Sequence, residues 1–226
     1  MSLSPTTLVR AAGLAAAASG LLFIGVQVGH PHLDATTITT TEMLVRDVVK
    51  ILMASLALAG VAGMYLRQVR QTGVLGLVGY LLLSVGYLLI TCTAFVAAFV
   101  LPDVAGDATP FVNGVLEAAT KGSTAADIGH LSTLIRVQGI AYLGGGLLLG
   151  VAMFRAGVLA RWGCALLAAG GVLSAALSLM PDAFFRLLAF PNGIAMVALG
   201  VSLWRLDRTP AAASAPGPAL VPAAAE

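Results

Sequence analysis

Six long apolar segments make up most of this 226-residue sequence and constrain its fold more than any other feature. Each is close to the ~20 residues that a helix needs to cross about 30 Å of hydrocarbon. They are continuously apolar, without the period-two alternation of barrel strands, so they indicate helices. The sequence therefore predicts an all-α fold, an integral membrane bundle of six transmembrane helices at about 8–28, 42–66, 73–101, 127–154, 158–180 and 184–205.

The composition supports lipid as the main surroundings of the chain. Hydrophobic residues are 59% of the sequence and charged residues only 10%, whereas a soluble domain has about 25% charged residues. The net charge of +2 and the absence of a long basic run exclude a typical nucleic-acid partner. Residues 209–226 are rich in Ala and Pro and lack a packing pattern, so we expect a disordered tail there.

The connections between the segments predict an orientation. Residues 67–72 and 155–161 are short and basic, and cytoplasmic connections are generally rich in Lys and Arg. We therefore expect a multi-pass protein of the cell membrane with cytoplasmic N- and C-termini. Seven of the twelve basic residues then lie inside: Arg10, Arg67, Arg70, Arg155, Arg161, Arg205 and Arg208.

The start of the second segment concentrates charge at the edge of an apolar helix. Glu42, Arg46 and Lys50 are spaced i, i+4, i+8 and share one face, with Asp47 three residues before Lys50. One interpretation is a polar pocket facing outward, because ionisable groups within spans generally mark functional sites. The alternative is a helix end whose charges neutralise one another.

The fourth segment carries a second polar group. His130 and Gln138 follow helical spacing, and Arg136 lies on another face. An unpaired Arg facing lipid costs at least ~2.5 kcal/mol. We therefore expect Arg136 either to face the bundle and pair with Asp47 or Glu42, or to extend to the membrane interface.

The third segment has a stripe of hydroxyl groups formed by Tyr80, Ser84, Tyr87 and Thr91. Lipid offers no partner for a hydroxyl, so the stripe should face inward. It would then line a cavity or pair with polar groups of neighbouring helices. Between the third and fourth segments, residues 109–122 fit a short surface helix, with Phe111, Val115 and Leu116 toward lipid, or a lid over the polar groups.

Motifs for catalysis and cofactor binding are missing from the sequence. It has no P-loop, HExxH, nucleophile elbow or haem-ligand pair, so we predict no catalytic residue and no cofactor. His30, His32 and Asp34 resemble a set of metal ligands, but no second cluster would fix their geometry, and we predict no metal site. Cys92 and Cys164 lie in apolar segments, and we expect two small buried residues without a disulfide.

Three stretches are informative together: the opening VRAAGLAAAASGLL, the charged head of the second segment, and its end MYLRQVRQ. They resemble a widespread group of bacterial membrane proteins of unknown function. The resemblance implies a helical bundle in a bacterial inner membrane. That group has no established activity, so the resemblance assigns no reaction or ligand.

Two functions fit these observations. The first is a small transporter or binding protein whose outward pocket holds a small polar or ionic ligand. The second is a structural or regulatory membrane subunit, in a homo-oligomer or with a partner membrane subunit, whose charges bind only one another or that partner. The residues predicted to form the pocket are Glu42, Arg46, Asp47, Lys50, Tyr87, His130, Arg136 and Gln138.

Overall fold

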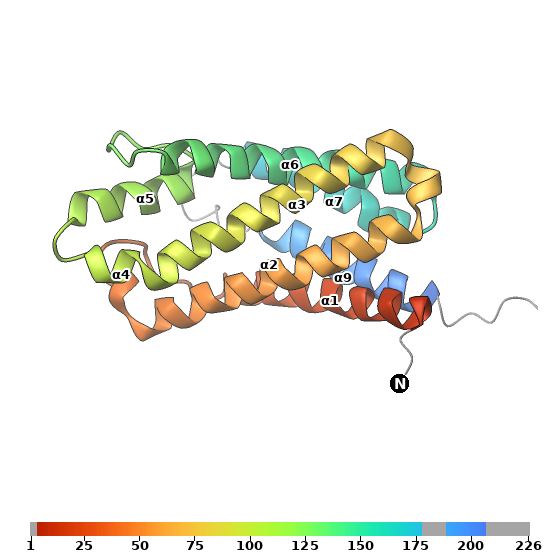
Figure 1. Cartoon of the computed structure of the whole chain (residues 1–226), viewed down its shortest axis with the longest axis horizontal. Helices are drawn as coiled ribbons and strands as arrows, with labels where there is room; N and C mark the ends of the chain where they lie inside the picture. Colours follow the sequence, from red (N-terminus) through yellow and green to blue (C-terminus); the bar gives the residue numbers. More distant parts are fainter. Residues whose placement is uncertain (1–3, 178–188, 207–226) are drawn as a thin grey trace, which may run out of the picture.

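The computed structural model describes residues 4–177 and 189–206. Over these residues it is a bundle of helices without strands, which confirms the predicted all-α fold. Six long helices run along the molecule (Figure 1): α1 (Pro5–Gly25), α2 (Thr41–Arg67), α3 (Val69–Phe99), α6 (Leu131–Ala156), α7 (Arg161–Leu177) and α9 (Ala189–Leu206). Short elements connect them: η1 (Thr37–Thr39), α4 (Leu101–Val104) and α5 (Thr109–Lys121).

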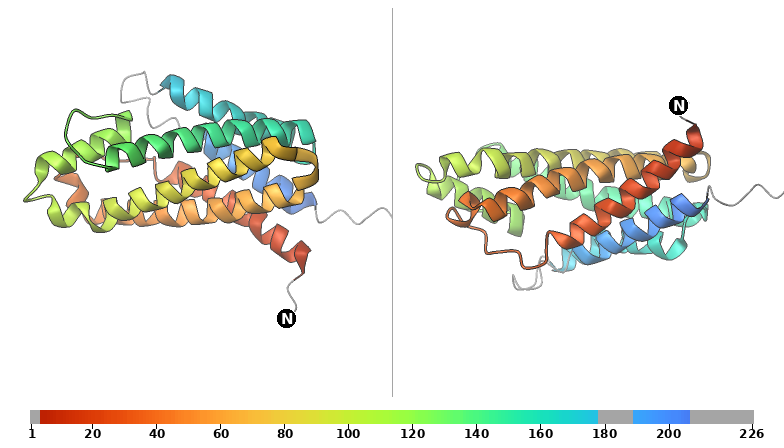
Figure 2. Two further views of the ribbon diagram at one scale, coloured as in Figure 1. Left: turned by 45° about the horizontal axis from the view of Figure 1, so that its top comes forward. Right: turned by 90° about the horizontal axis from the view of Figure 1, so that it is seen from below.

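The long helices form a closed ring. Each packs mainly against its neighbours in the chain, from α1 through α2, α3, α6 and α7 to α9, and α9 packs back against α1. Figure 2 shows the same arrangement from two other sides. The short elements α4 and α5 lie at one end of the bundle, which we call the α5 end, while both ends of the described chain lie at the other end (Figure 1).

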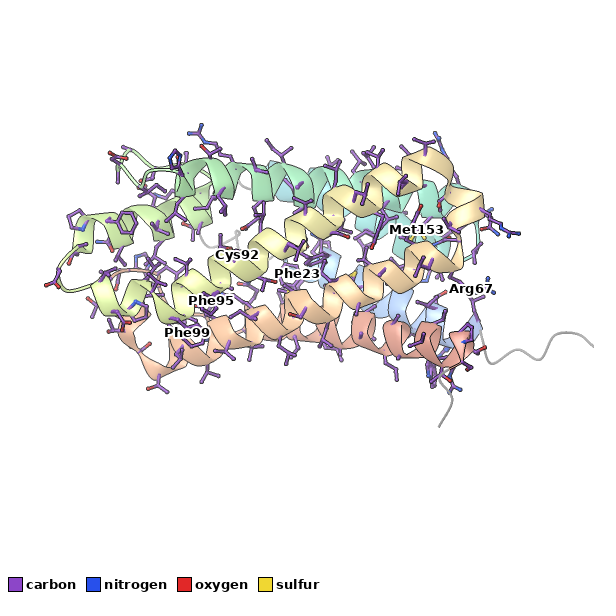
Figure 3. All side chains as sticks on the ribbon, in the orientation of Figure 1. Phe23, Arg67, Cys92, Phe95, Phe99 and Met153 are labelled. Atoms are coloured by element: carbon purple, nitrogen blue, oxygen red, sulfur yellow. The ribbon has the colours of Figure 1, made fainter. Side chains whose placement is uncertain are left out.

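The surface of the bundle is suited to lipid. Five helices, α1, α2, α3, α6 and α9, are long and apolar enough to cross a membrane. Large apolar side chains cover the outside: Val74 is 77% exposed and Ile140 is 73% exposed. Phe95 and Phe99 are further examples, on α3 near the α5 end (Figure 3). Contiguous apolar surface of this kind is unfavourable in water, so the chain is a multi-pass membrane protein.

The predicted segments correspond to the six long helices, with shifted boundaries. The first begins earlier, at Pro5, because Ser4 caps it: the Ser4 hydroxyl accepts a hydrogen bond from the Thr7 N–H at 3.2 Å. The fourth begins later, at Leu131, because residues 122–130 form a loop. Parts of the predicted fifth and sixth segments, 178–180 and 184–188, and the predicted tail at 209–226 lie outside the described residues.

Close approach of helix backbones holds the ring together. Gly13 on α1 and Gly200 on α9 face each other, and a Cβ at Gly13 would lie 2.8 Å from the Gly200 carbonyl oxygen. Gly86 on α3 has a similar place against Tyr142 on α6. Inside lipid the hydrophobic effect does not drive helices together, so van der Waals packing over small residues has to do so.

Two adjacent glycines on α6 allow a direct test of this packing. A Cβ at Gly145 would lie 2.6 Å from the Leu83 Cα, whereas a Cβ at Gly144 would meet nothing within 4 Å. Because backbone cannot move aside locally, we expect Gly145→Ala to lower the free energy of unfolding by about 1–3 kcal/mol. Gly144→Ala should be neutral or stabilising by up to about 1 kcal/mol.

The measurement is thermal unfolding of both variants and the unsubstituted protein in the same detergent. The expected order of melting temperature has Gly145→Ala lowest. Equal melting temperatures for the two variants would contradict the close packing of α3 against α6.

Candidate functional site

A second apolar cluster builds the α5 end of the bundle. It is separate from the main core and joins α5 to the connection before α2 and to α4. Its buried residues include Ile38, Met43, Leu101, Val112, Val115, Leu116, Ile128 and Ile135. Val115 and Leu116 are therefore buried against protein, so their predicted exposure to lipid is wrong, and α5 instead covers the ends of the long helices.

A cavity of about 290 Å³, with apolar walls and several polar side chains, lies beneath α5. Its walls come from both apolar clusters, because Met53 belongs to the main core and Met43 and Leu116 to the cluster at the α5 end. The polar side chains among its lining residues are Gln27, His30, Asp47, Lys50, Thr93, Thr120 and Gln138. The size is at the lower limit of small-molecule pockets, which are usually about 300–1,000 Å³.

An ion pair forms the chemical centre of this cavity. Lys50 Nζ donates to Asp47 Oδ1 at 2.7 Å, as the spacing of three residues on one helix predicted. Asp47 is only 1% exposed, and its second oxygen, Oδ2, is buried without a hydrogen-bond partner among the described residues. Lys50 has two further N–H groups and no other protein partner there. The pair thus leaves both an acceptor and donors unused beside the cavity.

The outer face of α2 beside this ion pair is apolar. Val45 is 55% exposed and Val48 is 42% exposed, on the turns that carry Asp47. These apolar side chains face away from the bundle, where lipid surrounds the helix. A carboxylate at this level has to point inward, because a charge facing lipid would be costly.

Gln138 completes the polar wall from α6. Its Oε1 accepts a hydrogen bond from the Thr93 hydroxyl on α3 at 2.9 Å. The amide nitrogen of Gln138 therefore has its two donors left, and Gln138 lines the cavity. The predicted pocket residue Gln138 is thus brought together with Asp47 and Lys50.

Arg46 does not line the cavity, and its ion pair with Glu42 fits the alternative of a helix end whose charges neutralise one another. Its guanidinium makes five hydrogen bonds, the number of its N–H donors: Nη1 to the carbonyls of Val26 (2.8 Å) and Val28 (3.1 Å), Nη2 to Gly29 O (3.1 Å), and Nε and Nη2 to Glu42 Oε1. The carbonyls follow the end of α1, which has no basic residue in its last turn. Arg46 therefore caps α1, and Glu42 Oε1 holds it there, so the donors of Arg46 are all used within the protein.

Besides Glu42 and Arg46, three more of the predicted pocket residues do not line the cavity. Tyr87 is buried deeper in the bundle, where its ring packs edge to face against Tyr142 with centroids 5.4 Å apart. His130 is exposed at the start of α6. Arg136 is exposed and has no ion pair within the described chain, so its predicted pairing with Asp47 or Glu42 is wrong.

The residues of the hydroxyl stripe on α3 make contacts within the bundle, by ring packing and by bonding to the helix backbone. Tyr80 stacks on Tyr65 with ring centroids 4.6 Å apart, and the Thr91 hydroxyl donates to the backbone of Tyr87 at 3.0 Å. None of the four stripe residues lines the cavity. The face of α3 that does so carries Ile90, Thr93, Ala94 and Ala97.

Thr93 was not predicted to line the cavity because it lies outside the stripe of Tyr80, Ser84, Tyr87 and Thr91. The face of α3 that carries Thr93 is otherwise apolar. The signal that indicates Thr93 is the i, i+3, i+4, i+7 spacing of Ile90, Thr93, Ala94 and Ala97, which places one hydroxyl on an apolar face of the helix. Gln27, His30 and Thr120 were missed as pocket residues for a different reason. They come from the end of α1, the connection after it and α5, which only the tertiary fold brings together.

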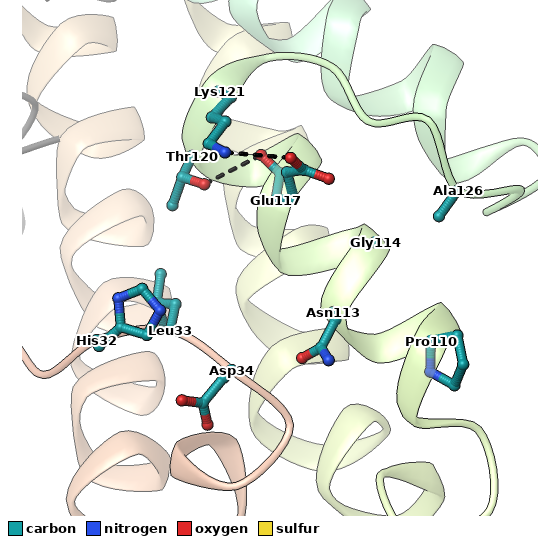
Figure 4. A pocket seen from close by; sticks show the side chains of 10 residues that line it. All are labelled: His32, Leu33, Asp34, Pro110, Asn113, Gly114, Glu117, Thr120, Lys121 and Ala126. Carbon is teal, nitrogen blue, oxygen red and sulfur yellow. Dashed lines mark hydrogen bonds and ion pairs between the residues drawn. The ribbon is translucent and has the colours of Figure 1, made fainter. Parts of the chain in front are cut away.

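A separate groove of about 470 Å³ lies between α5 and residues 32–34 on the outer surface (Figure 4). Its polar groups already hold the local fold: Asp34 Oδ1 accepts from the backbone N–H of Thr36 and Thr37, and Asn113 Oδ1 accepts from Ala35 N–H at 2.8 Å. The Thr37 N–H bond above all lowers the pKa of Asp34.

Glu117 has a comparable structural role on α5. Its carboxylate accepts from the Thr124 hydroxyl and pairs with Lys121, and these contacts lower its pKa, the Thr124 bond most. No group of three metal-ligating side chains occurs among residues 4–177 and 189–206. Cys92 and Cys164 are free thiols, and Cys92 is exposed on α3, contrary to the expectation that both are buried.

Comparison of the chain with protein-family models, with curated proteins and with solved structures finds no match. The resemblance to bacterial membrane proteins of unknown function therefore stays a prediction.

The capping role of Arg46 predicts a strong difference between two arginines. Lysine has three donors on one nitrogen and cannot reach the carbonyls of Val26, Val28 and Gly29 together. We expect Arg46→Lys to lower the free energy of unfolding by about 2 kcal/mol. Arg136→Lys should change it by less than about 0.5 kcal/mol, because Arg136 is exposed.

Thermal unfolding in detergent micelles measures both variants under identical conditions. A melting temperature for Arg46→Lys that equals that of Arg136→Lys would show that the cap contributes nothing to stability.

Proposed function

We propose that this protein is a small solute-binding protein of the membrane, of the kind that carries a solute across or presents it at the surface. The cavity beneath α5 is its binding site, and Asp47, Lys50 and Gln138 contact the solute. The observation that supports this most is the buried Asp47 Oδ2, which has no hydrogen-bond partner in the described protein and belongs to a residue that lines the cavity.

The energetic argument is one of desolvation. A buried carboxylate oxygen without a partner costs a large part of the free energy gained by its ion pair. Buried polar groups in proteins are nearly always satisfied, by protein, by water or by a bound molecule. Because Asp47 lines a cavity of about 290 Å³, there is room beside the residue for such a partner, and a small movement of the side chain would bring Oδ2 to it.

The distribution of charge supports an outward-facing site. Within the described residues, Arg10, Arg67, Arg70, Arg155, Arg161 and Arg205 are all near the end opposite α5. Figure 3 shows Arg67 there. The positive-inside rule makes that end cytoplasmic. The cavity then opens toward the outside, beneath a lid formed by α5.

The alternative of a structural or regulatory subunit is favoured by a different observation. All five donors of Arg46 and one carboxylate oxygen of Glu42 are used within the protein, as a structural role requires. The two functions differ in whether the cavity is wet. A solute-binding site has to admit water and small molecules, whereas a structural core excludes them.

Cysteine labelling distinguishes the two at adjacent positions of α3. Ala94 is 5% exposed and lines the cavity, and Phe95 is 53% exposed on the outer, lipid-facing surface. In a background of Cys92→Ser and Cys164→Ala, we expect Ala94→Cys to react with a charged, membrane-impermeant thiol reagent added outside. Phe95→Cys should not react, because lipid excludes the reagent.

Two exposed positions control for orientation in the same background. Thr39→Cys lies at the α5 end, and Gln71→Cys lies in the first turn of α3, at the opposite end. From outside, Thr39→Cys should react and Gln71→Cys should react only after permeabilisation. The reverse pattern would overturn the orientation, and labelling is then repeated from the other side. If Ala94→Cys fails to react from either side, the cavity is dry and the solute-binding proposal is wrong.

A further inference from the structure

We infer that the occupant of the cavity is a small zwitterion with an apolar body, of the kind represented by a neutral α-amino acid. This inference rests on the proposed function and deepens it, because it names the chemical class of the solute. The ammonium group of the zwitterion contacts Asp47 Oδ2, and its carboxylate contacts Lys50 and Gln138.

The first step of the argument is the sign of the charges in the site. Asp47 and Lys50 present opposite charges side by side, with Lys50 Nζ 2.7 Å from Asp47 Oδ1. A simple cation would approach Asp47 but be repelled by Lys50, and a simple anion would meet the reverse. A zwitterion placed antiparallel to the ion pair meets an opposite charge at both ends, and the attraction is strong in surroundings of low dielectric constant.

The second step is the supply of hydrogen-bonding groups. Asp47 Oδ2 needs a donor, and an ammonium group brings three. Lys50 and the amide nitrogen of Gln138 need acceptors, since Gln138 already uses its oxygen to accept from Thr93. A carboxylate has two oxygens for them. The zwitterion therefore satisfies groups of both kinds that the protein leaves open.

The third step is the rest of the wall. Apart from Gln27, His30, Thr93 and Thr120, the rest of the cavity is lined by apolar side chains, among them Phe23, Met43, Met53, Ile90 and Leu116. Such a wall favours an aliphatic or thioether group on the solute and disfavours a polar one. The volume of about 290 Å³ limits the solute to a single small molecule.

Three probes of matched shape test the inference on the full-length protein in lipid nanodiscs. They are L-leucine, 3-methylbutylamine, which lacks the carboxylate, and 4-methylpentanoate, which lacks the ammonium group. We expect calorimetric binding of L-leucine, with the other two weaker by about tenfold or more, because each leaves one charged group of the site unpaired. If the three probes bind equally, or if either single-charge probe binds more tightly, the inference is wrong.

One variant and its control test the contact between the ammonium group and Asp47. Asp47→Asn should weaken L-leucine by about tenfold or more while 4-methylpentanoate binds no more weakly than before, because only the ammonium partner is lost. Glu117→Gln is the control, since Glu117 lies on α5 outside the cavity lining, and it should leave both affinities unchanged. If Asp47→Asn does not fold, the comparison of the three probes on the unsubstituted protein still decides the matter.

The failure of this inference differs from the failure of the proposed function. If Ala94→Cys is labelled but L-leucine does not bind, the cavity is wet and accessible, and only the zwitterion is wrong. If Ala94→Cys is not labelled and L-leucine does not bind, both are wrong.

Discussion

The ion pair between Asp47 and Lys50 determines how the α5 end of this bundle has to be built. A carboxylate at membrane depth has to turn away from lipid, so α2 presents Val45 and Val48 outward and Asp47 inward. The interior then has to offer polar partners, and it does so through Lys50, with Gln138 beside the cavity. What remains unsatisfied is Asp47 Oδ2, a buried oxygen of a residue that lines the cavity. The chemistry of the site follows from this one buried charge.

Three further features stabilise the arrangement. Arg46 uses all five of its donors on the end of α1 and on Glu42, which fixes the end of α1 relative to the start of α2. The second apolar cluster then seats α5 over the cavity. Glycine contacts such as Gly13 with Gly200 close the ring of helices below it. The charged residues of α2 thus have two roles within three turns of the helix: Arg46 with Glu42 caps α1, and Asp47 with Lys50 lines the cavity.

The sequence predicted the fold well because lipid imposes a simple rule, about 20 apolar residues for each crossing. Helical spacing also predicted the pairs Glu42 with Arg46 and Asp47 with Lys50, since both partners lie on one helix. It did not predict which groups face the cavity. Arg46 and Lys50 share a face by spacing, yet Arg46 caps α1 and Lys50 lines the cavity. Their different roles depend on where α1 ends in space, which the spacing within α2 does not contain. Tyr87 and Arg136 were misplaced for the same reason: the rotation of a helix against its neighbours is set by packing, which periodicity alone does not contain.

A density map of the protein in lipid nanodiscs, at a resolution that shows ordered water, tests the central claim most directly. That claim is that Asp47 Oδ2 faces an occupied polar cavity. The account predicts a distinct feature within hydrogen-bond distance of Oδ2, either a solute or a water molecule, bounded by Lys50 and Gln138. A map in which Oδ2 accepts a hydrogen bond from a protein donor, with side chains filling the space beneath α5, would contradict it.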